Sequence, residues 1–273
     1  MVEDLTASSI PAPWHRTGQG EPLLLLHGVV LTWQSWLPVL DDLATDHDIL
    51  AATLPGHWGG PAPQHPATVS SLADYVETLL DETGWDTAHI AGNSLGGWLA
   101  LELAARGRAR SVTAVAPAGL WADPTSAAAL IRRFRALGPL VGIDSARPSA
   151  MPSMIRSLLL PLLAHRPATV DHRLAKLMAA AATNCLIIDD LAHDPGLPAG
   201  FTALDSLSIP VTILMPEYDR VLPPHLYAPL TTTPTREVHH LDGVGHVPML
   251  ETPDRVTAAI RSTIARAAAA RSA

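Results

Sequence analysis

Cysteine, lysine and long apolar runs are scarce in this chain of 273 residues, and each shortage excludes a class of protein. The single cysteine, Cys185, cannot form an internal disulfide or a zinc site that needs several cysteines. Lys176 is the only lysine and the formal net charge is −8, which argues against a nucleic-acid or membrane partner. The longest apolar stretches, such as Leu158–Ala164, are too short to span a bilayer. Because the chain also starts with acidic Glu3 and Asp4, where a signal peptide would be basic, we expect a cytoplasmic protein.

Short apolar runs alternate with helix-period segments along most of the chain, in which hydrophobic residues make up 48%. Six runs are typical of strands buried on both faces: Leu23–Leu26, Ile49–Leu54, Ala88–Ala91, Ser111–Ala116, Val211–Met215 and Glu237–Leu241. Four segments have helical periodicity: Trp36–Thr45, Leu72–Asp81, Leu95–Ala105 and Val256–Ala267. The alternation predicts an α/β fold, with a mostly parallel central sheet covered by helices on both faces. Trp14–Thr17 is expected to add an antiparallel edge strand.

The alternation stops between residues 119 and 208. This stretch contains three helix-like segments, Ala127–Arg135, Met154–Leu163 and Val170–Asp190, with prolines between them and no convincing strand. We expect a helical cap inserted over the sheet, although extra covering helices would give the same pattern. The predicted domains are a core of residues 1–118 and 209–273 and a cap of residues 119–208.

A serine follows the third expected buried strand. It lies in Gly92-Asn93-Ser94-Leu95-Gly96, which comes after the strand and opens a helix. A sharp strand-to-helix turn of this kind projects the serine hydroxyl outward, and its glycines permit the tight backbone. The turn also places Ser94 at a helix N-terminus, where developing negative charge is stabilised. The pattern predicts a nucleophilic serine, although an ordinary glycine-rich turn can look the same.

Two further residues complete a candidate catalytic set. Asp219 follows the strand Val211–Met215, and His246 lies on a loop after the strand Glu237–Leu241. Both lie where parallel strands end, the edge at which ligands meet such a sheet. A serine needs a base and the base needs an orienting acid, so we predict that Ser94, His246 and Asp219 act together. Glu217 and Asp242 are alternatives to Asp219 as the acid.

Two backbone N–H groups are expected to stabilise a tetrahedral oxyanion. One belongs to Leu95, directly after the nucleophile, and the other to Val29 in the turn that follows the first buried strand. His27, at the start of that turn, is interpreted as a residue that shapes the loop. His239 and His240 are strand neighbours that point to opposite faces, so they cannot chelate one metal together.

These motifs resemble those of the α/β-hydrolase superfamily over nearly the whole chain. The resemblance rests on Leu24–Gly28, Leu54–His57, Gly92–Gly97, Asp219-Arg220 and Gly245-His246. It implies hydrolysis through an acyl-enzyme, with no metal and no organic cofactor. Oligomeric state is left open.

The motifs of this chain depart from those of several known subfamilies, and these departures reduce the number of reactions to expect. Haloalkane dehalogenases and epoxide hydrolases of this fold carry aspartate at the elbow, and Ser94 argues against both. Meta-cleavage-product C–C hydrolases are similar at Gly92–Ser94 and Asp219-Arg220, but their Gly-Pro-Gly-type oxyanion loop is missing. The stretch Gly245–Glu251 is closer to small esterases. We therefore expect a carboxylesterase first and a C–C hydrolase second, with a thioesterase, a lactonase or a non-hydrolytic ligand-binding member as further alternatives.

Tryptophans lie near the predicted active edge. Trp33 and Trp121 are candidates for lining the substrate pocket, whereas Trp36 and Trp98 are expected to pack helices on the sheet. An apolar roof is expected from Leu130, Leu158 and Met178 of the cap. Such a pocket favours a small-molecule ester with an apolar acyl or alcohol part. An inward-facing arginine among Arg132, Arg133 and Arg135 would instead favour the acidic substrates of C–C hydrolases.

Overall fold

A single sheet of seven strands organises the fold. The computed structural model describes residues 10–137 and 159–272. The strand order is β1-β3-β2-β4-β5-β6-β7, and β1 pairs antiparallel with β3 while all other pairs are parallel. The strands are β1 Trp14–Thr17, β2 Glu21–Leu26, β3 His47–Ala52, β4 Ala88–Asn93, β5 Ala109–Val115, β6 Val211–Pro216 and β7 Arg236–Leu241. The expected α/β class and the antiparallel edge strand are both confirmed.

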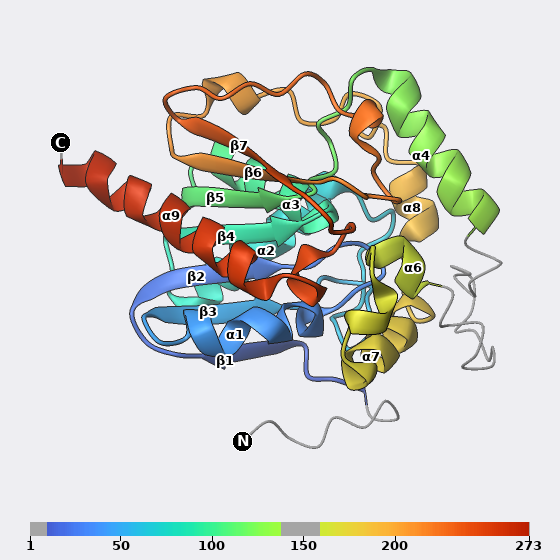
Figure 1. The fold of residues 1–273 in the computed structure, drawn as a ribbon, viewed down its shortest axis with the longest axis horizontal. Helices are drawn as coiled ribbons and strands as arrows, with labels where there is room; N and C mark the ends of the chain where they lie inside the picture. Colours follow the sequence, from blue (N-terminus) through green and yellow to red (C-terminus); the bar gives the residue numbers. More distant parts are fainter. Residues whose placement is uncertain (1–9, 138–158, 273) are drawn as a thin grey trace.

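Helices cover the sheet on both faces. Helices α1 (Leu37–Leu43) and α9 (Pro253–Ser272) pack on one face, and α2 (Val69–Thr83) and α3 (Leu95–Ala105) on the other (Figure 1). This double cover explains the leucine run of β2, whose last four residues are all 0% exposed. Neighbouring residues determine where α2 begins and ends. Thr68 and Ser71 form a capping box at its start, and Gly84 ends it in the left-handed conformation.

The segment between β5 and β6 is helical. It holds α4 (Pro124–Leu137), α6 (Leu160–Leu163), α7 (His172–Ala182) and α8 (Ile188–Ala192), which gather at one end of the sheet (Figure 1). Within residues 119–137 and 159–208 no strand interrupts these helices, although Trp121 forms an isolated bridge with Tyr227. Part of the expected helix Met154–Leu163 lies outside the described residues. A separate cap domain with the stated boundaries stays a prediction.

The expected helix Val170–Asp190 is wrong in one respect, because the chain breaks between α7 and α8. Asn184 Nδ2 and Thr183 Oγ1 both donate to the Ala180 carbonyl, at 2.8 and 3.0 Å. Side chains that bond the backbone in this way compete with the helical hydrogen bonds. The Leu186 N–H then donates to the Gly56 carbonyl at 2.8 Å, which draws the chain onto the core. The helical period alone gave no sign of this long-range contact.

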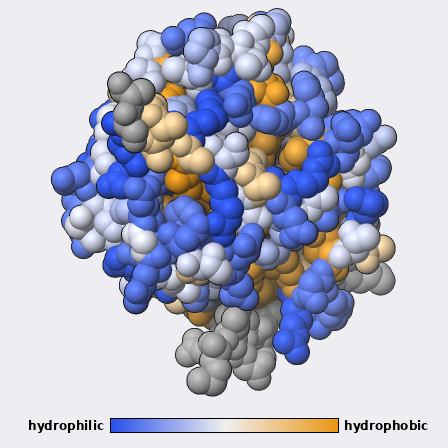
Figure 2. Space-filling model, turned by 60° about the vertical axis from the view of Figure 1, so that its left-hand side comes forward, coloured by the Kyte–Doolittle hydropathy of each residue, from blue (hydrophilic) through white to orange (hydrophobic). Residues whose placement is uncertain are grey.

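Hydrophilic residues dominate the face shown in Figure 2, and apolar residues appear there only in small separate patches. Scattered apolar exposure of this kind is normal for a folded chain. None of the helices in the described residues is both long enough and apolar enough to cross a membrane.

Candidate active site

Ser94 lies on a strained turn between β4 and α3. Its φ of 55° and ψ of −114° are costly for a residue with a side chain. Three backbone hydrogen bonds hold the turn: the Ser94 N–H donates to Val115 at 2.9 Å, and the Ser94 carbonyl accepts from Trp98 and Ala118 at 3.1 and 3.0 Å. A Cβ at Gly92 would lie only 2.0 Å from the carbonyl oxygen of Gly96, so the flanking glycines allow this close approach.

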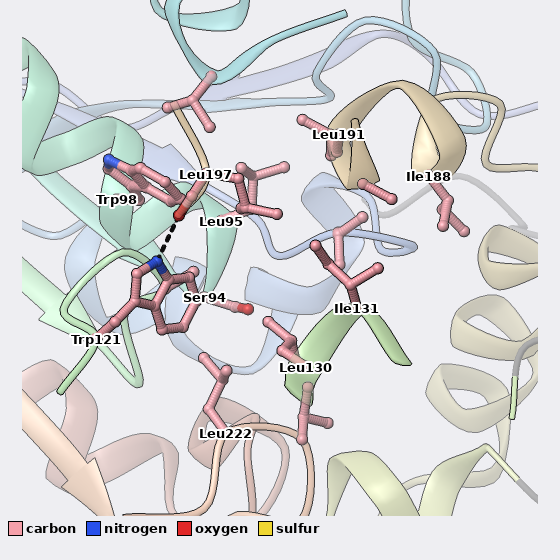
Figure 3. Close-up of a pocket in the computed structure, with 15 residues that line it drawn as sticks. Ser94, Leu95, Trp98, Trp121, Leu130, Ile131, Ile188, Leu191, Leu197 and Leu222 are labelled. Atoms are coloured by element: carbon pink, nitrogen blue, oxygen red, sulfur yellow. Dashed lines mark hydrogen bonds between the residues drawn. The ribbon is translucent and has the colours of Figure 1, made fainter. Parts of the chain in front are cut away.

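The Ser94 hydroxyl points into an apolar pocket (Figure 3). The cavity has a volume of about 80 Å³. Its lining comes from the turn after β2, from α2, α3 and the chain after β5 and β6, and from α4 and α8. The lining residues are Val29, Val69, Ser94, Leu95, Trp98, Ala118, Trp121, Leu130, Ile131, Ile188, Leu191, Ala192, Leu197, Val221 and Leu222. Ser94 is the only one of them with a hydroxyl or a titratable side chain.

His246 and Asp219 form a buried pair. His246 Nδ1 lies 2.7 Å from Asp219 Oδ2, and the two side chains are 4% and 1% exposed. The other carboxylate oxygen, Oδ1, accepts the N–H groups of Val221 at 2.8 Å and Leu222 at 2.7 Å. An ionised carboxylate only accepts, so Nδ1 of His246 is the donor in this pair, and Nε2 is the ring nitrogen that Asp219 does not engage. This is the orientation that a general base needs.

The loop that carries His246 lies against the serine turn. Asn93 Nδ2 donates to the His246 carbonyl at 3.0 Å and to the Val115 carbonyl at 3.2 Å. No hydrogen bond joins Ser94 to His246 among the described residues, and such bonds often form fully only when substrate is bound.

A second turn, after β2, faces the pocket through Val29. The Leu31 N–H donates to the Gly28 carbonyl at 3.1 Å and closes the turn, which forces Val30 to a φ of 63°. Positive φ is a rare and costly conformation for a β-branched residue. Within the described residues the N–H groups of Val29 and Leu95 donate no hydrogen bond to the protein.

His27 supports this turn with both ring nitrogens. Nδ1 lies 2.8 Å from the Gly28 carbonyl, and Nε2 accepts the Leu54 N–H at 2.9 Å. The ring is therefore a neutral imidazole with its proton on Nδ1. Complete burial holds the pKa of His27 well below its ordinary value, and the neighbouring His57 lowers this pKa further. The contacts agree with the prediction that His27 shapes the loop.

The alpha/beta hydrolase family model matches residues 23–259. The chain belongs to this family. It is 39% identical over 211 residues to the epoxide hydrolase EphH of Mycobacterium tuberculosis, covering 71% of this chain and 93% of that protein. A 2-hydroxymuconate semialdehyde hydrolase of a Pseudomonas species is 30% identical over 107 residues, but that match covers only 38% of either chain.

A solved esterase of Thermogutta terrifontis has the same fold as this hydrolase. The two superpose with a TM-score of 0.68 over 93% of both chains, at 21% identity. At that identity the likeness concerns the fold alone.

The tryptophans of this hydrolase differ in part from expectation. Trp121 lines the pocket, where its indole N–H donates to the Leu197 carbonyl at 2.8 Å (Figure 3). Trp98 was expected only to pack α3 on the sheet, but it also lines the pocket, edge to face with Trp121 at 6.0 Å. Trp33 does not line this pocket. Its indole N–H donates instead to the Ala12 carbonyl at 3.0 Å, and its ring stacks on His15.

Of the three residues expected to form an apolar roof, only Leu130 is seen to line the pocket. Met178 is buried in α7 instead, and Leu158 lies outside the described residues. Arg132 is exposed, whereas the side chains of Arg133 and Arg135 lie outside the described part of the structure. Nine apolar lining residues were not predicted from the sequence, because no local pattern shows which side chains of helices and loops far apart in the chain face the same cavity. They are Val69, Ala118, Ile131, Ile188, Leu191, Ala192, Leu197, Val221 and Leu222.

The alternative acids do not contact His246. Glu217 is exposed and its Oε2 accepts the Gly243 N–H at 2.9 Å, while the Asp242 carbonyl accepts from Arg255. In the part of the chain that the structure describes, no three His, Cys, Asp or Glu side chains form a group that could hold a metal ion.

Proposed function

We propose that this hydrolase cleaves carboxylic esters that carry an apolar acyl or alcohol part, through an acyl-enzyme on Ser94. One observation carries the proposal: a lone hydroxyl on a strained turn opens into a pocket that is otherwise apolar. Such a pocket favours a neutral, apolar substrate and excludes water from the reacting carbonyl. The substrate is therefore a small molecule.

His246, oriented by Asp219, serves as the base in this mechanism. Its Nε2 takes the proton of Ser94 as Oγ attacks the ester carbonyl. When the tetrahedral intermediate collapses, His246 returns the proton to the departing alcohol. Water then attacks the acyl-enzyme while His246 takes its proton, and His246 gives that proton to Ser94 Oγ as the bond to the serine breaks and the carboxylic acid leaves. The unpaired N–H groups of Val29 and Leu95 are the proposed donors to the oxyanion.

Epoxide opening is the second candidate, since EphH, a 39% identical relative, is named an epoxide hydrolase. The serine at the elbow argues against it on chemical grounds. Attack of the Ser94 oxygen on an epoxide carbon would leave an ether on the enzyme. An ether has no carbonyl for water to attack, so turnover would stop, whereas a carboxylate nucleophile forms an ester that water can cleave.

A C–C hydrolase receives less support from the pocket. Its acidic substrates need a cationic partner, and none of the described lining residues carries a charge.

We propose that the enzyme acts in a reducing compartment such as the cytoplasm, since its one cysteine is free and buried.

The deciding experiment measures hydrolysis of p-nitrophenyl esters from acetate to decanoate, with styrene oxide assayed in parallel. We expect ester turnover in the wild type and a loss of about 10³-fold or more in Ser94→Ala, with the fold unchanged by circular dichroism. Ester turnover that survives in Ser94→Ala would refute the mechanism. Epoxide turnover without any ester turnover would refute the substrate class.

A further inference from the structure

The Glu251 carboxylate joins two segments that are far apart in sequence. Its Oε2 accepts the N–H of Gly245, directly before His246, at 2.8 Å, and the N–H of His165 at 2.9 Å. Its Oε1 accepts the Arg166 N–H at 2.7 Å. His165 and Arg166 follow α6 in the helical segment between β5 and β6. One half-buried carboxylate therefore binds the histidine loop and this helical segment at the same time.

Other contacts bring the same two regions together. The Val247 N–H donates to the Leu163 carbonyl at 2.9 Å, and Arg220 Nη1 donates to the Pro161 carbonyl at 2.8 Å. A Cβ at Gly245 would lie 2.6 Å from the His165 nitrogen, so the two backbones are in close contact there. Residues 161–166 thus rest on the two loops that carry Asp219 and His246, and α6 lies beside the start of α9 (Figure 1).

The main chain around His246 is held at three successive residues. Glu251 accepts from Gly245, Asn93 donates to the His246 carbonyl, and Leu163 accepts from Val247. Of these three partners only Glu251 is charged, and hydrogen bonds to a charged acceptor are about twice as strong as neutral ones. Glu251 is also the only one of them whose side chain contacts both the loop and the helical segment.

We propose that Glu251 is a positioning residue for His246: it fastens the histidine loop to the helical segment over the sheet. The inference rests on the proposed function for its effect on turnover, but not for its effect on geometry. Without the carboxylate, His246 keeps its contact with Asp219 but loses the support of its main chain on the N-terminal side. The imidazole then spends less time in the orientation that catalysis needs, and small misplacements of catalytic groups cost large factors in rate.

Substrate binding is affected much less, because none of Glu251, Gly245 and His165 lines the pocket. The predicted signature is a lower kcat with a nearly constant KM. Glutamine retains one side-chain oxygen, which can accept the N–H groups of Gly245 and His165. Its NH2 group then faces the N–H of Arg166, and two donors form no hydrogen bond. Glu251→Gln is therefore expected to fall between the wild type and Glu251→Ala.

The test compares Glu251→Ala and Glu251→Gln with Glu217→Gln. Glu217 is a matched control because its carboxylate also accepts one N–H of the same loop, from Gly243, but forms no hydrogen bond to the described part of the helical segment. We expect kcat on a p-nitrophenyl ester to fall about 10- to 100-fold in Glu251→Ala and less in Glu251→Gln, and to stay near the wild-type value in Glu217→Gln. Rates are measured well below the unfolding temperature of each variant. If Glu251→Ala lowers only that temperature and keeps the wild-type kcat, Glu251 is structural and the proposal is wrong.

A second measurement does not depend on turnover. The proton between His246 Nδ1 and Asp219 should give a downfield NMR signal in the wild type, assigned by its absence in His246→Ala. We expect this signal to broaden or shift in Glu251→Ala and to remain unchanged in Glu217→Gln. An unchanged signal in Glu251→Ala would overturn the proposal even if no ester is hydrolysed. Absence of ester turnover with a perturbed signal would instead count against the proposed function alone.

Discussion

Asn93 and His246 are separated by 153 positions in sequence, yet the amide of one donates to the carbonyl of the other at 3.0 Å. Asn93 is the last residue of β4, directly before Ser94, so this bond joins the serine turn to the histidine loop. The same amide donates to Val115 on β5. A side chain that belongs to neither residue thus helps to fix the position of Ser94 relative to His246.

Asn93→Asp tests this link. Aspartate is about as large as asparagine, but it replaces the donating NH2 group by an oxygen. This oxygen faces the carbonyls of His246 and Val115, so both contacts become repulsive. We expect a loss of about 1–3 kcal/mol or more in the free energy of unfolding, because the site is fully buried. Urea unfolding followed by tryptophan fluorescence measures the loss. Stability equal to that of the wild type would show that the loop is held by other contacts.

Asp219→Asn tests the orientation of His246, the proposed base. Asparagine can still accept from Val221 and Leu222 through its oxygen, which turns its amide toward His246 Nδ1. A donor there favours the opposite tautomer, with the proton on Nε2, and a protonated Nε2 cannot take a proton from Ser94. We expect kcat to fall by about 10³- to 10⁴-fold while the fold persists. A fall of similar size in Glu217→Gln would instead revive Glu217 as the acid.

His27 predicts a pH dependence of stability. Its pKa is lowered in the folded protein by burial, so as the pH falls below about 6.5 only the unfolded chain takes up the proton. His27 therefore costs no stability above that pH, and below it lowers the free energy of unfolding by up to about 1.4 kcal/mol per pH unit. Urea unfolding between pH 7.5 and 5 should show a smaller loss on acidification in His27→Gln than in the wild type. If the free energy of unfolding falls equally with pH in His27→Gln and in the wild type, His27 does not titrate differently in the folded and unfolded states.

Trp121 predicts the acyl-chain preference. Removing the indole opens the wall that it forms with Trp98, so Trp121→Ala should favour longer or bulkier acyl groups by about 10-fold or more in relative kcat/KM. The cavity should also cost about 3–5 kcal/mol in stability. Trp33→Phe is the control, since Trp33 contacts Ala12 and His15 outside the pocket. A shift in preference that is equally large in Trp33→Phe would contradict the described pocket.

The local sequence pattern was sufficient to predict the central sheet of this protein and the turn that carries Ser94. The leucines of β2 and the glycines around Ser94 predict a buried strand and a sharp turn because each depends on residues only a few positions apart. The rhythm of strand and helix then predicts a parallel sheet, and a parallel sheet brings the ends of its strands to one edge. For this reason Ser94, Asp219 and His246 could be proposed as partners from the sequence alone.

Other features depended on contacts between distant segments, which no local pattern encodes. The sequence favoured Asp219 over Glu217, but only the folded chain shows that the Asp219 carboxylate contacts His246 while Glu217 is exposed. The sequence favoured Trp33 for the pocket and Trp98 for helix packing, but the fold places Trp33 against Ala12 and His15 and brings Trp98 to the pocket. Glu251 gave no local signal, because its role depends on the backbone of His165 and Arg166. The sequence therefore determined most of the elements and the candidate reactive groups, whereas tertiary packing decided which of them meet, since that choice depends on the summed burial and hydrogen bonding of the whole fold.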